Sequence, residues 1–403
     1  AAREGASVRL VSYKETTLRH ASGLIDLLGY TPDGEGPLED PYDALETLPA
    51  DHPYRLLGEA RVREGMATFD EITGDRYRGE HTDANALVPT CGGTVKPTAR
   101  YPAGAAAGLA SDPRSTLFVG IERVPDFEPS IAADRLAAVG VPFDTSAATV
   151  EFPIPLRDDA KKTRFAHLLD ANETVDGAGE GVRRAIAETV KPHLGDAERV
   201  GFPAILGQDH PAEVRDDLAS ALGADVFEVP MGPPNLPGLR LESLLYDALE
   251  AAGGRFEVGS PVVSYSADGE VIERVAIDRS GQEIPMTAEQ YVLATGGLES
   301  DGIGATREQV TEPLFDCHVP QPADRYDWFE DDVFGDHAFA RFGVDVAADL
   351  RPQTADGDPE FANLRAAGGV VGNYDYAAQK CGSGVSIATG HGAGQRAAED
   401  ATQ

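Results

Sequence analysis

Residues 363–369 read NLRAAGG and open a glycine-rich stretch. We interpret 364–367 as a buried strand that stops at Gly368 and Gly369, where a backbone without side chains can approach a ligand closely. Further along, CGSGV at 381–385 opens a run of small residues that predicts a helix. The N-terminus of such a helix directs backbone N–H groups and a positive dipole end at an electron-rich group. The stretch therefore predicts a cofactor site.

A second strand upstream ends in the same way. Residues 290–297 read QYVLATGG, which predicts a buried strand followed by Thr295, Gly296 and Gly297. A helix, a small meander, a strand ending in ATGG and a late NLxAxG segment follow one another in flavoproteins built on two dinucleotide-binding folds. The order predicts a flavin and a Rossmann-like α/β domain, whereas each glycine turn alone is also consistent with an ordinary connection between strand and helix.

Several other segments have clear periodicity. The sequence predicts strands at 117–121 and 203–207, helices at 129–139 and from 239 onward, and a meander of strands at 256–258, 262–265 and 271–277. Gly140 is expected to cap the 129–139 helix.

The first twelve residues read AAREGASVRLVS. They predict the last turn of a helix, a cap at Gly5 and a strand at 8–11, which is the second half of a βαβ unit. No GxGxxG loop follows a predicted strand in the sequence. We expect the first half of the unit, with its phosphate loop, to precede Ala1 in the complete protein; the alternative is that the fold begins here.

The end of the 8–11 strand bears on the type of flavin. FAD enzymes usually place an acidic residue there, where it hydrogen-bonds the ribose of the adenosine. This sequence has Ser12 instead, with Glu15 three residues later. The substitution favours FMN, which has no adenosine ribose, and leaves FAD possible.

The charge of the chain is strongly negative. Asp and Glu total 68 against 34 Lys and Arg, which gives a formal net charge of -34, and the acidic residues are spread along the chain. Such a surface repels nucleic-acid phosphates. It is typical of proteins that work in concentrated salt, where the Debye length falls to about 3 Å and self-repulsion is tolerable. We infer a halophilic source.

Three cysteines, Cys91, Cys317 and Cys381, are widely separated. They exclude a disulfide framework and form no CxxC pair, so the sequence predicts neither a metal site nor an iron–sulfur cluster. Free thiols suit a reducing cytoplasm. No apolar run approaches the roughly 18 residues of a membrane helix, so any membrane association is expected to depend on partners.

Four blocks of the sequence resemble one known family, the B-type (flavoprotein) subunit of anaerobic glycerol-3-phosphate dehydrogenase. They are ASGLIDLLGYTPDG at 21–34, HPYRLLG at 52–58, LPGLRL at 236–241 and GNYDYAAQKCGSG at 372–384. The first is similar to the family's SSGSLDLLGYLPDG and the second to its HPYSLLG. The last departs from the family pattern at Lys380 and Ser383, where glycines are expected. The resemblance runs nearly end to end and, with the charge, indicates a haloarchaeal type.

The resemblance implies an FMN-carrying subunit of a quinone-linked dehydrogenase. With a catalytic partner subunit it would oxidise sn-glycerol 3-phosphate to dihydroxyacetone phosphate in glycerol catabolism. A membrane-anchoring iron–sulfur subunit would pass the electrons to the quinone pool, which places this chain at the cytoplasmic face of the membrane. The alternative is a stand-alone flavin-dependent reductase or dehydrogenase of the fumarate-reductase or ketosteroid-dehydrogenase kind.

The residue patterns and the resemblance together give one set of predicted cofactor-binding residues. They are Ser12, Ser22, Gly23, Thr295, Gly296, Gly297, Gly368, Gly369, Asp375, Gln379, Gly382, Ser383 and Gly384.

Oxidation of a secondary alcohol requires a base for the hydroxyl proton, and histidine suits that role near neutral pH. His20 and His337 are the candidates, although either can be a structural histidine. A substrate phosphate requires arginine, whose planar fork matches phosphate oxygens. Arg19, Arg55 and Arg240 lie in or beside the family-like blocks, and each can instead form an ordinary ion pair. Two roles therefore stay open: this subunit oxidises the substrate itself, or it carries electrons for a partner that holds the substrate.

The expected architecture has two parts. Residues 1–100, 238–300 and 356–403 form a discontinuous flavin-binding domain, and residues 101–237 and 301–355 form an α/β cap or substrate domain.

Overall fold

The computed structural model describes residues 1–176 and 179–402. The chain divides into two compact units, which we call unit 1 (1–16, 26–73 and 245 onward) and unit 2 (17–25 and 74–244). This division differs from the predicted domains. Residues 17–25, 74–100 and 238–244 join unit 2 instead of the predicted flavin domain, and 301–355 join unit 1 instead of the predicted cap. The assignment of flavin binding and substrate binding to the two parts stays a prediction.

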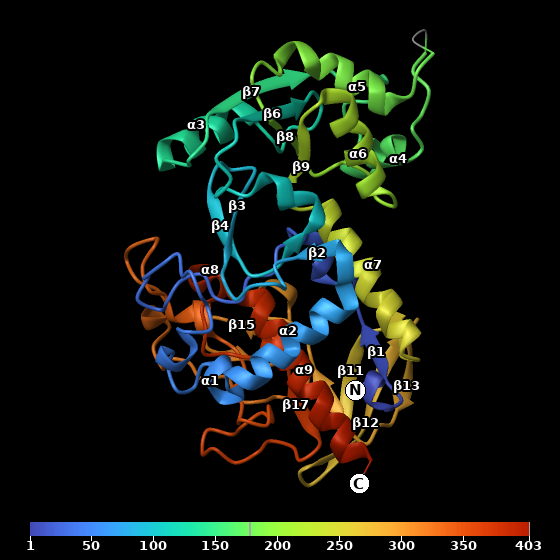
Figure 1. Cartoon of the computed structure of the whole chain (residues 1–403). Coiled ribbons are helices and arrows are strands. Elements are labelled where there is room, and N and C mark those ends of the chain that lie inside the picture. Colours follow the sequence, from blue (N-terminus) through green and yellow to red (C-terminus); the bar gives the residue numbers. More distant parts are fainter. Residues whose placement is uncertain (177–178, 403) are drawn as a thin grey trace. The chain divides into compact units, whose positions relative to one another are not determined.

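Unit 2 contains a parallel sheet with helices around it (Figure 1). Its α-helices are α3 (Pro129–Val139), α4 (Lys162–Asp170), α5 (Val182–Val190) and α6 (Pro211–Leu222). Its strands are β2 (Tyr77–Arg78), β3 (Ala86–Pro89), β4 (Val95–Thr98), β5 (Tyr101–Pro102), β6 (Thr116–Ile121), β7 (Thr145–Val150), β8 (Arg199–Pro203) and β9 (Asp225–Val229). The 3₁₀ helices are η2 (Thr17–His20), η4 (Gly74–Arg76), η5 (Ala103–Gly108) and η6 (Lys191–His193).

The parallel sheet has the order β7-β6-β8-β9. Every residue of β6 and of β8 is buried, because a strand in the middle of a parallel sheet is covered on both faces. Helix α3 ends at Gly140 in the left-handed conformation, which confirms the predicted cap. The predicted strand at 203–207 was wrong: β8 is the strand, and Pro203 is its last residue.

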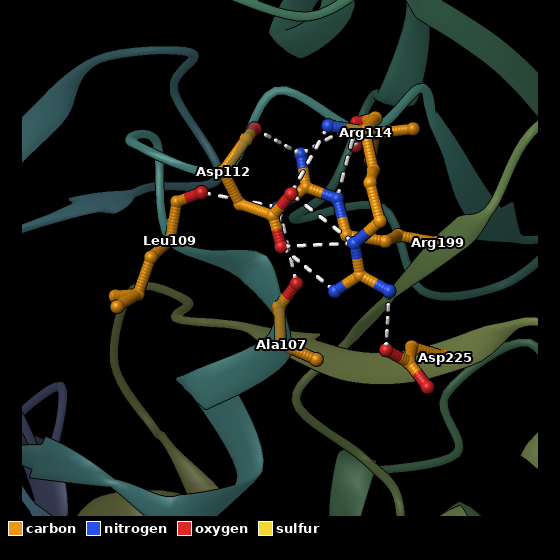
Figure 2. A network of polar contacts seen from close by, with 7 residues as sticks. Ala107, Leu109, Asp112, Arg114, Arg199 and Asp225 are labelled. Atoms are coloured by element: carbon orange, nitrogen blue, oxygen red, sulfur yellow. Dashed lines mark hydrogen bonds and ion pairs between the residues drawn. The ribbon is translucent and has the colours of Figure 1, made fainter.

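A buried arginine organises the edge where these strands begin. The guanidinium of Arg199, fully buried at the first position of β8, donates to the carbonyl oxygens of Ala107, Leu109, Asp112 and Arg114 at 2.8–3.2 Å (Figure 2). These carbonyls belong to the end of η5 and to the loop before β6, so one cation holds several carbonyl groups of neighbouring segments together. The network is structural.

Unit 1 contains the long C-terminal helix and several small sheets. Its α-helices are α1 (Pro53–Leu57), α2 (Glu59–Thr73), α8 (Tyr376–Gln379) and α9 (Gly382–Ala401), and α7 (Leu236–Ala251) runs across the division between the units. Its strands are β1 (Arg9–Ser12), β10 (Arg255–Val258), β11 (Val262–Asp268), β12 (Val271–Arg279), β13 (Gln282–Met286), β14 (Tyr291–Leu293), β15 (Gly304–Ala305), β16 (Val310–Thr311) and β17 (Leu364–Ala366). The 3₁₀ helices are η1 (Ala2–Glu4), η3 (Leu45–Thr47), η7 (Leu298–Ser300), η8 (Arg325–Trp328), η9 (Ala338–Arg341) and η10 (Gly368–Val370).

Strand pairing in unit 1 corrects two sequence-based expectations. The meander consists of β11, β12 and β13, whereas β10 pairs in parallel with β1. The buried strand predicted within 290–297 is shorter and less buried than expected: β14 covers three residues, and its middle residue, Val292, is 44% exposed. Helix α9 packs against α1 and α2, and the absence of a side chain at Gly65 of α2 lets the two helices approach at Ala388 (Figure 1). Among the helices that the described residues form, none has the length and apolar character to cross a membrane.

Candidate flavin site

Two glycine turns meet at the carboxyl ends of β14 and β17. The strands pair in parallel, with Leu293 opposite Ala366, so the turns that follow lie side by side. A Cβ atom placed on Gly297 would lie 2.8 Å from the carbonyl oxygen of Gly369, and one placed on Gly369 would lie 3.2 Å from the amide nitrogen of Gly297. No side chain fits between the turns. The structure therefore brings together the two glycine pairs that the sequence singled out, on the strand ends where open α/β sheets bind ligands.

Helix α9 is joined directly to this turn. The N–H of Gly368 donates to Thr389 Oγ1 at 2.9 Å, and Thr389 in turn donates to the Val385 carbonyl at 2.6 Å. Helix α9 begins at Gly382, and its N-cap residue, Cys381, makes no side-chain cap. The first turn of a 20-residue helix therefore lies in the same unit as the glycine turns, where its dipole favours electron-rich groups.

Gly384 has a packing role. Its N–H donates to the Asp26 carbonyl at 2.8 Å, so this donor is already used within the protein. A Cβ atom at Gly384 would lie 2.2 Å from the Tyr54 hydroxyl oxygen and 2.8 Å from the Cα of Leu27. Glycine is required here because α9 lies directly on the 26–28 segment. The sequence-based assignment of Gly384 to the cofactor has this second explanation in the structure.

Two other predicted cofactor residues support the backbone around α8. Asp375 caps α8 by accepting from the N–H groups of Ala377 and Ala378 at 2.9 and 2.8 Å. The carbonyl of Gln379 accepts from the N–H groups of Gly29 and Tyr30. The LLGY block and the QxCGxG block, about 350 residues apart in the sequence, are thereby hydrogen-bonded to each other.

The side chain of Gln379 belongs to a buried polar cluster that the sequence analysis did not assign. Gln379 Oε1 accepts from His52 Nε2 at 3.1 Å and from the Cys381 thiol at 3.4 Å. The other ring nitrogen, His52 Nδ1, accepts from the Tyr54 N–H at 3.1 Å and so caps α1. Burial lowers the pKa of His52 to about 4 and raises the pKa of the Cys381 thiol. Near neutral pH both groups are uncharged, and Cys381 is an unreactive thiol.

The remaining predicted cofactor residues lie in different places. Ser12 ends β1, and its hydroxyl donates to the Lys14 carbonyl. Ser22 and Gly23 belong to unit 2, where Ser22 Oγ accepts from the Leu24 N–H at 3.3 Å. A Cβ atom on Gly23 would lie 2.7 Å from the Cβ of Pro237, so the first and third family-like blocks pack on each other. Thr295, Gly296 and Ser383 lie in unit 1 with the glycine turns and α9.

The two histidine candidates have different surroundings. His20 is the last residue of η2 in unit 2 and is exposed. His337 lies in unit 1, where both ring nitrogens are used: Nδ1 accepts from the Glu330 N–H at 3.0 Å and Nε2 contacts the Val333 carbonyl at 3.1 Å. His337 therefore supports a loop, and the structure gives it no open nitrogen for a substrate proton.

The arginine candidates all have protein partners. Arg240 forms a two-pronged pair with Glu228, with Nη1···Oε2 and Nη2···Oε1 distances of 2.6 and 3.0 Å. Arg19 pairs with Glu242 at 3.2 Å, and Arg55 donates to backbone carbonyls, including that of Leu48 at 3.2 Å. Each of the three guanidinium groups is engaged with acceptors of the protein, so the structure shows none of them held open for a substrate phosphate.

Glu228 is a buried carboxylate that sequence reasoning missed. Burial opposes its ionisation, but the Arg240 charge and hydrogen bonds, Arg215 and the Leu206 N–H together lower its pKa. A Cβ atom on Gly104 would lie 2.7 Å from Glu228 Oε2, so the ion pair is closely packed. In β9 every residue from Val226 to Val229 is buried, so burial does not set position 228 apart, and nothing local in the sequence shows which cation meets it.

Comparisons with known proteins agree with this geometry. Residues 1–385 match the family described as FAD binding domain. A probable B-type subunit of anaerobic glycerol-3-phosphate dehydrogenase from Halobacterium salinarum (strain ATCC 29341 / DSM 671 / R1) is 59% identical over 401 residues, which cover 99% of this chain and 94% of the relative. The B-type subunit of anaerobic glycerol-3-phosphate dehydrogenase from Pectobacterium atrosepticum is 31% identical over 402 residues, covering 96% and 91%.

Among solved structures, a 3-ketosteroid-delta4-(5alpha)-dehydrogenase from Rhodococcus jostii RHA1 aligns over 100% of this chain and 93% of its own, at 14% identity and a TM-score of 0.39. That likeness is too low to bear on function. The family match confirms the predicted Rossmann-like flavoprotein fold class and the prediction of a flavin. A salt-adapted relative also fits the net charge of -34. The chain belongs to the FAD-binding-domain flavoproteins and, within them, to the family of the B-type subunit of anaerobic glycerol-3-phosphate dehydrogenase.

Proposed function

We propose that this chain is the flavoprotein subunit of a quinone-linked dehydrogenase that oxidises sn-glycerol 3-phosphate to dihydroxyacetone phosphate. The observation that carries the proposal is the 59% identity over 99% of the chain to a subunit named for this enzyme. The aligned region includes the glycine turns, α9 and the four sequence blocks, because it covers 99% of the chain. The bacterial relative at 31% identity is named for the same subunit.

The residues of unit 1 fit a flavin. Gly297 and Gly369 leave no room for side chains between the two turns, and the N-terminus of α9 supplies a positive dipole end. A bound flavin supplies a hydride acceptor for alcohol oxidation. The glycine turns would hold it by backbone contact, and α9 would stabilise negative charge on it. Thr389 would keep the Gly368 turn and α9 in fixed register.

The serine at the end of β1 supports FMN as the bound form. Ser12 occupies the position where FAD enzymes usually carry an acid for the adenosine ribose. Its hydroxyl is directed to the Lys14 carbonyl. Acid release of the cofactor followed by chromatography distinguishes the two forms: recovery of FAD alone contradicts FMN.

We further propose that a catalytic partner subunit holds the substrate, while this chain carries electrons. This division is supported by the engagement of Arg19, Arg55 and Arg240 with protein partners and by the two occupied nitrogens of His337. A membrane-anchoring iron–sulfur subunit would receive the electrons for the quinone pool and hold the complex at the cytoplasmic face of the membrane. The names of the relatives, which describe one subunit of a larger enzyme, support assembly with other subunits.

Purified protein in molar potassium chloride tests the proposal. The chain is loaded with flavin and mixed anaerobically with glycerol 3-phosphate, alone and with the catalytic subunit. We expect the visible flavin absorption to bleach only when the catalytic subunit is present. Bleaching of the chain alone places oxidation in this subunit, and no bleaching in either mixture contradicts the proposed substrate.

A further inference from the structure

One loop of unit 1 exposes large apolar side chains. In the segment 324–337, Tyr326, Phe329, Val333 and Phe334 are 79%, 56%, 79% and 95% exposed. Clusters of exposed apolar side chains mark interaction sites. Salts that are excluded from protein surfaces, such as sulfate and phosphate, strengthen the burial of apolar groups, so exposed apolar side chains cost more free energy in their presence. We call this segment the apolar loop.

The apolar loop is anchored from beneath. Trp328 is buried, its ring nitrogen donates to the Pro322 carbonyl at 3.0 Å, and its ring meets Phe342 edge-on with centroids 5.6 Å apart. Phe329 packs on Phe339 at 5.2 Å. The exposed residues are therefore carried on a base that is fixed by packing.

His337 closes the apolar loop across its base. Its two nitrogens contact the Glu330 N–H and the Val333 carbonyl, and the Gly335 N–H donates to the Asp332 carbonyl at 2.9 Å. Asp332 also accepts from the Phe334 N–H at 3.0 Å. A loop that is ordered before binding loses little conformational entropy when it binds, so its side chains contribute more of their contact energy to affinity.

The charges around the apolar loop select the kind of partner. Residues 324–336 contain six carboxylates and one arginine, and one of these carboxylates, Asp336, already pairs with Arg341. Such a rim is repelled by the negative surface of a membrane leaflet. A second copy docking through the same patch would bring like charges together. The rim fits a protein groove bordered by Lys and Arg, and because the Debye length at molar salt is about 3 Å, these charges act only in direct contact.

The base of the apolar loop is tied to the candidate flavin site. The chain continues from the loop through η9, where the Arg341 carbonyl accepts from the Asn373 N–H at 3.0 Å. Next, the Val344 N–H donates to the Val370 carbonyl at 2.7 Å, and the Gly372 N–H donates to the Val344 carbonyl at 3.0 Å. Residues 370–373 connect the Gly368–Gly369 turn to α8 and α9. A protein bound at the loop contacts an element attached to the cofactor segment, and electron transfer requires such proximity.

We propose that the apolar loop is the docking element for the electron-accepting partner protein, which presents an apolar groove bordered by basic side chains. This inference rests on the proposed function, because it takes the chain to pass electrons from its flavin to another subunit. Val333 and Phe334 enter the groove, and Trp328 and His337 keep the loop in its binding conformation. The carboxylates other than Asp336, which pairs with Arg341, face the basic border.

Binding of the flavin-loaded full chain to the purified iron–sulfur subunit tests the proposal in molar potassium chloride. The double variant Val333→Ser/Phe334→Ser removes the exposed apolar groups, and Asp331→Lys reverses one rim charge. The matched control, Ile131→Ser/Val139→Ser, changes two side chains of α3 that are 51% and 60% exposed. Dissociation constants are measured by biolayer interferometry, and thermal melting checks that each variant is folded.

We expect the double variant to weaken binding at least about ten-fold, as truncation of interface hot spots does, while the control stays within about two-fold. Asp331→Lys should also weaken binding to the iron–sulfur subunit, because it places a positive charge opposite the basic border; this is a second, independent test. Unchanged binding by both loop variants overturns the proposal. Loop-dependent binding to phosphatidylglycerol vesicles, or loop-dependent self-association in light scattering, without binding to the iron–sulfur subunit also overturns it.

Bleaching by glycerol 3-phosphate with the catalytic subunit is measured on the same samples. If the flavin still bleaches with glycerol 3-phosphate and the loop variants bind the iron–sulfur subunit as the unmodified chain does, the docking inference is refuted and the proposed function stands. Loss of bleaching in the unmodified protein refutes the proposed function itself.

Discussion

Gly297 and Gly369 lie so close that a Cβ atom on the first would be 2.8 Å from the carbonyl oxygen of the second. Real Cβ atoms essentially never approach backbone oxygens so closely, so a side chain at Gly297 forces the two turns apart. The turns follow the paired strands β14 and β17, and the candidate flavin site depends on their spacing.

Gly297→Ala is therefore expected to lower flavin retention and to destabilise the fold by about 1–3 kcal/mol, the usual cost of overpacking. Flavin content after gel filtration and chemical denaturation measure the two effects. Gly390→Ala is the control, because that glycine lies in α9 with open space around its Cβ position. The control should keep its flavin and gain up to about 1 kcal/mol from helix propensity. Full flavin retention by Gly297→Ala contradicts the proposed role of the turns.

Gly384→Ala tests the contact between α9 and the 26–28 segment. The new methyl group would meet the Tyr54 hydroxyl at 2.2 Å, so we expect a loss of about 1–3 kcal/mol in unfolding free energy. Adding Tyr54→Phe removes the nearest atom and should recover part of the loss, although the Tyr54 bond to the Leu27 carbonyl is then missing. No recovery in the double variant would show that another contact, such as that with Leu27, dominates.

Arg240→Met leaves Glu228 buried without its main partner. Breaking a buried pair costs about 3–5 kcal/mol, and we expect the lower end because Arg215 also lowers the pKa of Glu228. The double variant Glu228→Gln/Arg240→Met should regain more than half of the loss, since no buried charge remains. Urea denaturation provides both values. If Arg240→Met instead raises KM for glycerol 3-phosphate without loss of stability, Arg240 is a substrate anion clamp.

His52 makes stability depend on pH. Burial lowers its pKa from 6.5 to about 4, so between these values the unfolded chain binds a proton that the folded protein does not. Its contribution is therefore complete above pH 6.5 and is lost as the pH falls towards 4. Since one pKa unit corresponds to about 1.4 kcal/mol, the loss reaches about 3 kcal/mol. Protonation at Nδ1 also removes the acceptor for the Tyr54 N–H.

His52→Asn should flatten this part of the stability profile, because asparagine can cap α1 without titrating. Unfolding free energies from pH 4 to 8 measure the difference from the unmodified protein. His81→Asn, at an exposed histidine, is the control and should leave the profile unchanged. A profile for His52→Asn that parallels the unmodified protein would assign the acid sensitivity to other groups.

The net charge of -34 predicts salt-dependent stability. Lowering potassium chloride from molar concentration to 0.1 M lengthens the Debye length from about 3 to about 10 Å, so more of the carboxylates repel one another. We expect a large fall in Tm by calorimetry, with recovery when salt is restored. A Tm that does not change with salt would contradict the interpretation of the acidic surface as a salt adaptation.

The sequence alone determined the features that depend on neighbouring residues. The apolar run of β6, the α3 helix with its Gly140 cap and the β17 strand before two glycines all follow from local periodicity and backbone freedom. The four sequence blocks identified the family because they are specific strings. These properties need no knowledge of distant parts of the chain.

Contacts between distant parts of the chain decided which strands and side chains pair with each other. Strand β10 looks like part of the meander, yet it pairs with β1, which precedes it by more than 240 residues. Glycine at position 384 is equally consistent with cofactor contact and with close packing, and only the position of Tyr54 reveals the packing. Arg240 has the features of an anion clamp until Glu228 is found beside it. Local patterns specify which faces are buried, but which groups meet there is set by long-range packing of the whole chain.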